Sequence, residues 1–193
     1  YHVGHCAYWQ GEGVQPFANV RAEDVENGRI APVFAPKEQV LAYLHDMESQ
    51  GRVHTLWPEH CLVGSWGWAC PNALVQALNA WDNLHHGQRP LHFYQKGEYP
   101  DAEMFSIFSY VNEATPNTHG KRVLNQLAQY DEVVVCGFAK DYCVAESVKD
   151  LRNDPRFEGK LRFFEAGMAA IDPQSANLSI YEECLNNFGA KCI

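Results

Sequence analysis

Cys143 is the residue of this sequence whose surroundings best suit covalent chemistry. It follows the run 133–136, three valines and a cysteine, which predicts a short buried strand that Gly137 then breaks. A helical pattern opens at Cys143, so its thiol is predicted to lie in the first turn of a helix, at the carboxyl end of a strand. Unpaired N–H groups and the positive end of the helix dipole favour a thiolate there. A buried structural cysteine is an equal alternative on this geometry alone.

Two further segments carry groups that could act at the same edge of a sheet. His60 lies in a turn just after the predicted strand 53–57, and imidazole is the commonest protein ligand of metal ions. Lys96 ends the predicted strand 91–95, and a lysine beside a cysteine favours the thiolate and stabilises developing negative charge. Taken alone, His60 is more simply explained as a hydrogen-bonded histidine in a turn, and Lys96 as a solvated surface lysine. We expect Lys96 and Cys143 to converge at a shared cleft.

The elements that must position these residues alternate along the chain. Apolar spacing predicts helices at 37–50, 69–84, 121–130 and 173–187, besides the helix that opens at Cys143. Strands are predicted at 53–57, 91–95, 132–136, 160–164 and 190–193. This alternation predicts a mostly parallel sheet with right-handed crossovers, hence a three-layer α/β/α fold. We expect a single domain over residues 1–193, in which residues 1–35 form an irregular loop that lines the site.

Composition excludes several classes of protein. The 193 residues, 46% hydrophobic and 20% charged, are ordinary for a globular domain with one substantial core. A net charge of −9 leaves no basic stripe for nucleic acid, and no apolar run approaches membrane-spanning length. The seven cysteines lack metal-knuckle spacing and suit a reducing compartment. We therefore expect a cytoplasmic protein with neither a nucleic-acid nor a membrane partner.

Three segments, in this order, resemble the isochorismatase-like cysteine hydrolases, on the nicotinamidase side of that superfamily. They are Trp57-Pro58-Glu59-His60-Cys61 with Gly64 and Gly67, Lys96-Gly97 with Phe105-Ser106-Ile107-Phe108, and Val135-Cys136-Gly137-Phe138-Ala139-Lys140-Asp141-Tyr142-Cys143-Val144. The resemblance runs from about Val53 to the end of the chain. It implies an isochorismatase-like fold and a hydrolase of non-peptide C–N bonds. The implied substrate is a small amide, first of all nicotinamide, which would be converted to nicotinate.

The resemblance also assigns catalytic roles. Cys143 would be the nucleophile that forms a thioester acyl-enzyme and releases ammonia, and Lys96 would be the catalytic lysine. The peptide N–H groups of Ala139 and Cys143 would form the oxyanion hole, beside a cis peptide bond between Phe138 and Ala139. The implied walls of a flat aromatic pocket are Trp57, Phe105, Phe138 and Tyr142.

A divalent metal ion is the cofactor that the resemblance implies. His60 would be a ligand of this ion, which would be zinc, iron or manganese, and His2 or His5 could supply another ligand. The ion would contact the pyridine nitrogen of the substrate. No organic cofactor is expected, and we expect a homo-oligomer.

Two motifs of the superfamily do not occur before Trp57. One is an Asp-x-Gln pattern that supplies the third catalytic residue, and the other is an Asp-x-His pair of metal ligands. We therefore expect an N-terminal portion with two central strands to precede Tyr1, because a parallel sheet without them would expose its edges.

Two other hypotheses stay open. The protein could be a relative that acts on another small amide, a carbamoyl compound or a vinyl ether, with the loop before Phe34 reshaping the pocket. It could also be a non-catalytic member that kept the sheet and lost the triad. The missing aspartate favours this last hypothesis, whereas the presence of both Lys96 and Cys143 argues against it.

Overall fold

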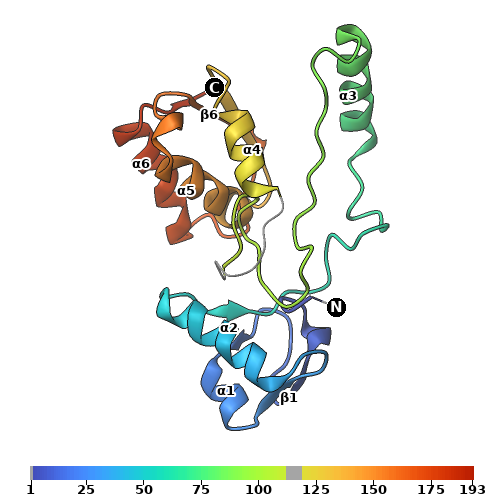
Figure 1. Cartoon of the computed structure of the whole chain (residues 1–193), viewed down its shortest axis with the longest axis vertical. Coiled ribbons are helices and arrows are strands. Elements are labelled where there is room, and N and C mark those ends of the chain that lie inside the picture. Colours follow the sequence, from blue (N-terminus) through green and yellow to red (C-terminus); the bar gives the residue numbers. More distant parts are fainter. Residues whose placement is uncertain (1, 112–118) are drawn as a thin grey trace. The chain divides into compact units, whose positions relative to one another are not determined.

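A computed structural model describes residues 2–111 and 119–193 of the chain. The contacts divide the chain into two compact units, Tyr1–Asp101 and Ala102–Ile193 (Figure 1). Each unit has its own buried apolar side chains. The single domain expected over residues 1–193 stays a prediction.

The first unit combines short strands with helices. Its helices are a 3₁₀ turn at Cys6–Tyr8, α1 (Ala22–Glu26), α2 (Lys37–Ser49) and α3 (Asn72–His85), and its strands are β1 (Trp9–Gly11), β2 (Asn19–Val20), β3 (Ile30–Pro32) and β4 (His54–Thr55). β1 pairs with β3 and β2 pairs with β4, both antiparallel. Val40, Leu44 and Met47 lie at helical spacing on the buried face of α2, as the sequence pattern predicts.

His54 ties three parts of the first unit together. Its ring is fully buried, with Nε2 3.0 Å from the carbonyl oxygen of Val3 and Nδ1 3.1 Å from the hydroxyl of Tyr43 on α2. A carbonyl only accepts, so Nε2 carries the proton and the Tyr43 hydroxyl donates to Nδ1. Trp9 Nε1 donates to the same Val3 oxygen at 2.7 Å. The imidazole therefore links α2 and β4 to the N-terminal segment.

The first unit differs from the sequence expectation in three places. The strand predicted at 53–57 shortens to β4 and pairs antiparallel with β2, whereas we expected it in a parallel sheet. The strand predicted at 91–95 is wrong, since these residues form no strand and Phe93 is 76% exposed. Residues 1–35, expected to be irregular, contain β1, β2, α1 and β3.

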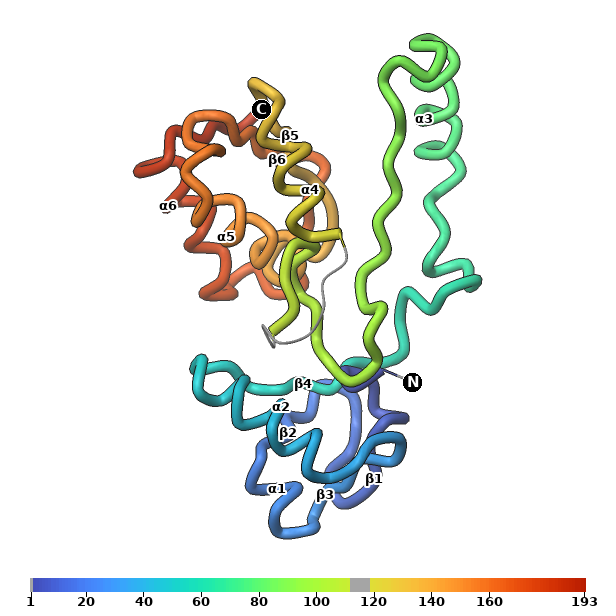
Figure 2. Tube along the Cα trace, in the orientation of Figure 1, coloured from blue at the N-terminus to red at the C-terminus, as the bar shows by residue number. Residues whose placement is uncertain are grey.

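The helix predicted at 69–84 is confirmed as α3, but its apolar side chains are not buried. Leu74, Trp81 and Leu84 are all exposed. Figure 2 traces the irregular stretches of chain that precede and follow this helix. Helical periodicity in a sequence therefore identified the helix without telling what covers its apolar face.

The second unit contains a parallel sheet of three strands. Its helices are α4 (Gly120–Leu127), a π-helical turn at Lys140–Val144, α5 (Ala145–Asn153), 3₁₀ turns at Pro155–Phe157 and Ala176–Leu178, and α6 (Ser179–Asn187). The strands β5 (Val133–Gly137), β6 (Leu161–Met168) and β7 (Lys191–Cys192) lie in the order β5-β6-β7. Helix α5 connects β5 to β6, and α6 connects β6 to β7. The predicted α/β class with a parallel sheet is thus confirmed.

Buried side chains of β5 and β6 contribute to the core of the second unit. Val133 pairs with Leu161, and all three of Val133, Leu161 and Phe163 are buried. The Phe163 ring packs edge-on against Tyr181 of α6, with ring centroids 5.0 Å apart. The register shifts between Val135 and Gly137, just where the chain leaves β5 for the turn that carries Cys143.

Among the residues that the structure describes, no helix is both long enough and apolar enough to cross a bilayer.

Acidification should destabilise the fold through His54. Burial lowers the pKa of His54 to about 4; the hydrogen bond to Val3 opposes this shift and the neighbouring His2 adds to it. An unfolded histidine titrates near pH 6.5, so the unfolded state takes up a proton first as the pH falls below that value. The free energy of unfolding should therefore decrease between about pH 6.5 and pH 4, by about 3 kcal/mol in all.

Urea unfolding at pH 7 and at pH 4.5 measures this effect. His54→Gln should lose this part of the pH dependence, whereas His45→Gln should keep it, because His45 is exposed and pairs with exposed Glu26. Equal pH dependence in the wild type and His54→Gln would contradict the assignment.

Candidate active site

Cys143 lies in a turn whose backbone is unusual from start to end. β5 ends at Gly137, whose φ of +125° is a conformation that other residues rarely adopt. The peptide bond between Phe138 and Ala139 is cis, at the position where the resemblance places one. The chain then forms the π-helical turn Lys140–Val144 before α5 begins. Cys143 therefore lies just before α5, which begins at Ala145, in a π-helical segment of the kind that recurs at functional sites.

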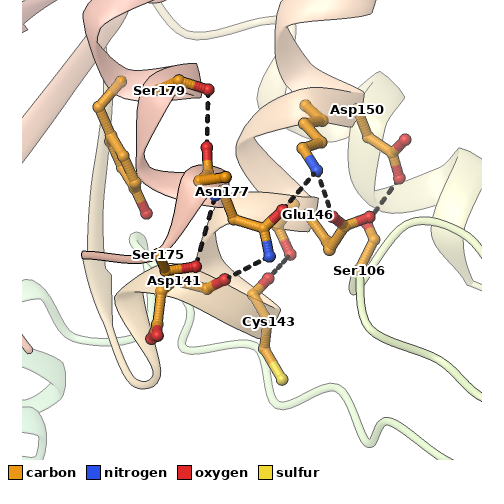
Figure 3. Close-up of polar contacts among 12 residues, drawn as sticks. Ser106, Asp141, Cys143, Glu146, Asp150, Ser175, Asn177 and Ser179 are labelled. Carbon is orange, nitrogen blue, oxygen red and sulfur yellow. Dashed lines mark hydrogen bonds and ion pairs between the residues drawn. The ribbon is translucent and has the colours of Figure 1, made fainter. Parts of the chain in front are cut away.

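Cys143 is half-buried, and its thiol points away from the hydrogen bonds that surround its backbone (Figure 3). The N–H groups of Tyr142 and Val144 both donate to the carbonyl of Ala139 at 3.2 Å, which fixes the backbone on either side of Cys143. Figure 3 shows the sulfur pointing away from the polar contacts that hold the turn. The turn can therefore be rigid while its thiol is still available to react.

Asp141 clamps this turn to the loop that follows β6. Its side chain is fully buried, and its two carboxylate oxygens accept the N–H groups of Ile171 and Asp172, each at 2.9 Å. Asn177 donates its side-chain amide to the carbonyl of Asp141 at 3.0 Å (Figure 3). A buried carboxylate is stable only when such donors compensate it. Sequence reasoning missed this residue, although an acid two positions before Cys143 was visible in the motif.

Lys140, the lysine nearest to Cys143 in the sequence, is committed to the neighbouring strand. Its ammonium lies 2.6 Å from Glu165 on β6 and 4.9 Å from the ring centroid of Tyr181. Its carbonyl accepts the hydroxyl of Tyr181 at 2.8 Å. Lys140 therefore helps to bind the turn to β6 and α6.

The aromatic residues predicted for the pocket differ in exposure. Phe138 is 74% exposed, whereas Tyr142 and Phe105 are half-buried. The pKa of Tyr142 is raised, first by burial and then by the charges of Asp141 and Asp172. The Tyr142 phenol is accordingly neutral at physiological pH and can contribute an apolar ring and a hydroxyl.

The histidines predicted as metal ligands gather in the first unit. The N–H of Trp57 donates to the carbonyl of Gly4 at 2.6 Å, and Trp57 forms an isolated parallel bridge with His5. This pairing brings the rings of His5 and His60 to a centroid separation of 5.4 Å, and the rings of His2 and His5 to 5.9 Å. Trp57 and His60, close in sequence, have ring centroids 6.3 Å apart.

Hydrogen bonds assign the protons of these rings. His60 Nδ1 lies 2.7 Å from the carbonyl oxygen of Pro58, so Nδ1 carries the proton and Nε2 has a lone pair. His2 Nδ1 accepts the N–H of Gly4 at 3.1 Å, so in the neutral ring the proton is on Nε2. Burial lowers the pKa of His5, and the neighbouring His60 lowers it further. His60 is therefore arranged like a metal ligand, since such a ligand usually donates its second N–H to a carbonyl, and His2 is not.

The donor set for a metal ion is incomplete. Among residues 2–111 and 119–193, no three His, Cys, Asp or Glu side chains are grouped to hold an ion. Divalent metals in proteins usually have at least three protein ligands. The residues described here therefore do not form a metal site by themselves, although the tautomer of His60 suits one.

Lys96 lies in the first unit, next to the N-terminal segment. Gly97 has φ of +68°, and a side chain there would meet the His2 ring at 3.7 Å. The N–H of Val3 donates to the carbonyl of Pro100 at 2.6 Å, which holds this segment in place. Lys96 itself is half-buried. The first unit thus brings the Lys96-Gly97 motif and the histidine group together.

The predicted site residues are divided between the two units. The first unit contains His2, Trp57, His60 and Lys96, and the second contains Phe105, Phe138, Ala139, Tyr142 and Cys143. Within each unit, residues from separate sequence motifs do come together.

Comparison with known proteins identifies the fold. No family model matches the sequence, and no curated protein matches it significantly. Among solved structures, the nicotinamidase/pyrazinamidase of Acinetobacter baumannii is similar, with a TM-score of 0.58 and 19% identity. The match covers 100% of this chain and 70% of the Acinetobacter chain. The yeast nicotinamidase matches all of this chain over 73% of its own length, with a TM-score of 0.57 and 16% identity. A second yeast structure, bound to the inhibitor nicotinaldehyde, has a TM-score of 0.58. This protein therefore has the fold of the nicotinamidases, the isochorismatase-like fold that the motifs predict.

Replacement of Asp141 should destabilise the second unit. Asp141→Asn keeps the shape of the side chain but turns an NH₂ group toward one of two backbone donors, which should cost about 2 kcal/mol of the free energy of unfolding. The matched control is Asp172→Asn, because the side chain of exposed Asp172 accepts the nearby N–H of Gln174, and this change should alter stability by less than about 0.5 kcal/mol. Chemical denaturation measures both variants, and equal effects would contradict the clamp.

Proposed function

We propose that this protein is a cysteine amidohydrolase that cleaves a small amide with release of ammonia, converting nicotinamide to nicotinate. The observation that carries the proposal is the strand–π-turn–helix unit that presents a half-buried thiol at the carboxyl end of β5, in a chain with the nicotinamidase fold. Ligands of open α/β sheets bind at the carboxyl ends of the strands, which is where Cys143 lies.

Each bond change in this reaction can be assigned. The thiolate of Cys143 attacks the carbonyl carbon of the amide, and the resulting oxyanion accepts hydrogen bonds from the N–H groups of Ala139 and Cys143. The C–N bond then breaks as the amide nitrogen takes up the proton that the Cys143 thiol gave up, so that ammonia leaves and a thioester remains on Cys143. Water attacks this thioester, which releases the carboxylic acid and regenerates the thiol.

Lys96 is the proposed catalytic lysine, and its ammonium would favour the thiolate and offset the charge of the intermediate. The support for this role is the resemblance of the Lys96-Gly97 segment. The ion pair of Lys140 with Glu165 also supports this assignment, because it engages the lysine nearest to Cys143 in the sequence in a structural contact. The proposed pocket walls are Trp57, Phe105, Phe138 and Tyr142.

A divalent metal ion at His60 is part of the proposal for the substrate. Its support is the His60 tautomer, which leaves Nε2 able to bind an ion, and the ring of His5 nearby. Zinc, iron and manganese are the candidates. The expected homo-oligomer and the expected cytoplasmic location stay predictions.

Loss of the Cys143 sulfur should abolish turnover. Cys143→Ala should lower the rate of ammonia release from nicotinamide by at least about a thousandfold, because it removes the group that forms the acyl-enzyme. Cys136→Ala is the matched control: Cys136 is an exposed cysteine on β5 just before the same turn, and it should keep the wild-type rate.

An ammonia assay with a panel of small amides also decides between substrates. Retained turnover in Cys143→Ala would remove the nucleophile assignment. Hydrolysis of another amide in preference to nicotinamide would change the assigned substrate but keep the assigned reaction, amide hydrolysis.

Zinc titration of the protein tests the role of His60. His60→Ala should weaken zinc binding by at least about tenfold, because it removes a ligand whose Nδ1–H is already oriented by the carbonyl of Pro58. His85→Ala is a close control, since half-buried His85 also has Nδ1 2.7 Å from a carbonyl, that of Trp81, yet lies outside the group formed by His2, His5 and His60. Identical zinc affinities of the two variants would count against a metal at His60.

A further inference from the structure

Ser147, four residues after Cys143, joins two segments that are far apart in the sequence. Its hydroxyl donates to the carbonyl of Cys143 at 2.7 Å and accepts the N–H of Ile107 at 3.1 Å. Residues four apart on a helix lie on the same face, so this contact to Cys143 follows from the helical spacing. The contact to Ile107 is a tertiary one. A single hydroxyl thus bridges the turn of the thiol and the segment Phe105–Ser109.

Asp150 holds the same segment one turn further along α5. Its Oδ2 accepts the hydroxyls of Ser106 at 2.6 Å and Ser109 at 2.7 Å (Figure 3 shows the pair Ser106–Asp150). The Ser106 oxygen in turn accepts the N–H of Phe108 at 3.0 Å. Ser147 and Asp150 are three residues apart and face the same way, so they form one continuous attachment line on α5.

Side-chain hydrogen bonds attach this segment to α5. Residues 105–109 belong to no helix or strand, so regular backbone pairing does not hold them. Ser106 is buried and Phe105 half-buried, so the segment lies against the unit. Hydrogen bonds to an ionised carboxylate are stronger than neutral ones, which makes Asp150 the stronger anchor.

We propose that Ser147 and Asp150 are positioning residues that fix the Phe105–Ser109 segment to α5, the helix that follows the Cys143 turn, and so set the place of Phe105 in the substrate pocket. This inference rests on the proposed function, in which Phe105 is a wall of the pocket and Cys143 is the nucleophile. Loosening the segment moves an aromatic wall and leaves the thiol chemistry intact. The effect should therefore appear in KM more than in kcat.

Hydrogen exchange and kinetics together test the anchor. In Ser147→Ala, exchange of the Ile107 amide should accelerate about fivefold, the loss expected for one neutral hydrogen bond. The KM for nicotinamide should rise about fivefold while kcat changes by less than about twofold. Ser147→Thr keeps the hydroxyl and should restore both values. Ser179→Ala is the control, because the hydroxyl of exposed Ser179 donates to the nearby carbonyl of Ala176.

Ser106→Ala tests the same anchor from the other side without altering α5, in case Ser147→Ala is unstable. Unchanged exchange of residues 105–109 in both variants would overturn the inference. So would a fall in kcat at constant KM, because Ser147 would then act on the thiol. A wild type that releases no ammonia from nicotinamide would sink the proposed function, whereas faster exchange in the variants would still support the anchor.

Discussion

The second unit depends on one electrostatic constraint, the burial of the Asp141 carboxylate. A carboxylate removed from water must find donors, and here the N–H groups of Ile171 and Asp172 supply them. These donors belong to the loop after β6, so satisfying the charge forces this loop against the turn that carries Cys143. The position of the thiol is therefore set by a residue that takes no part in the chemistry.

Polar contacts hold the Cys143 turn from two directions. On one side, Asp141, Asn177 and Tyr181 attach it to the segments that follow β6. On the other side, Ser147 and Asp150 attach it to residues 105–109. The nucleophile role proposed for Cys143 requires that its backbone be held by groups whose own positions are fixed. These hydrogen bonds hold the backbone of the turn, and the sulfur points away from them (Figure 3).

The first unit gathers its histidines by backbone pairing. The contacts of Trp57 with Gly4 and His5 place the N-terminal segment beside the turn of His60. Buried His54 also holds this segment, because it donates to the carbonyl of Val3 and accepts the hydroxyl of Tyr43 on α2. A neutral, fully bonded imidazole therefore acts as a structural group, while His60, with an Nε2 lone pair, is able to bind a ligand.

The sequence determined the α/β class, the helices α2 and α3, the strand β5 and the motif around Cys143, because these depend on local periodicity and on turn residues. Tertiary structure decided the rest. Residues 91–95 have the apolar character of a strand but form none, since a strand exists only where a partner accepts its backbone hydrogen bonds. Asp141, Ser147 and Asp150 carry no local signal of their tertiary contacts, because each bonds to a segment tens of residues away. Only folding brings such partners together.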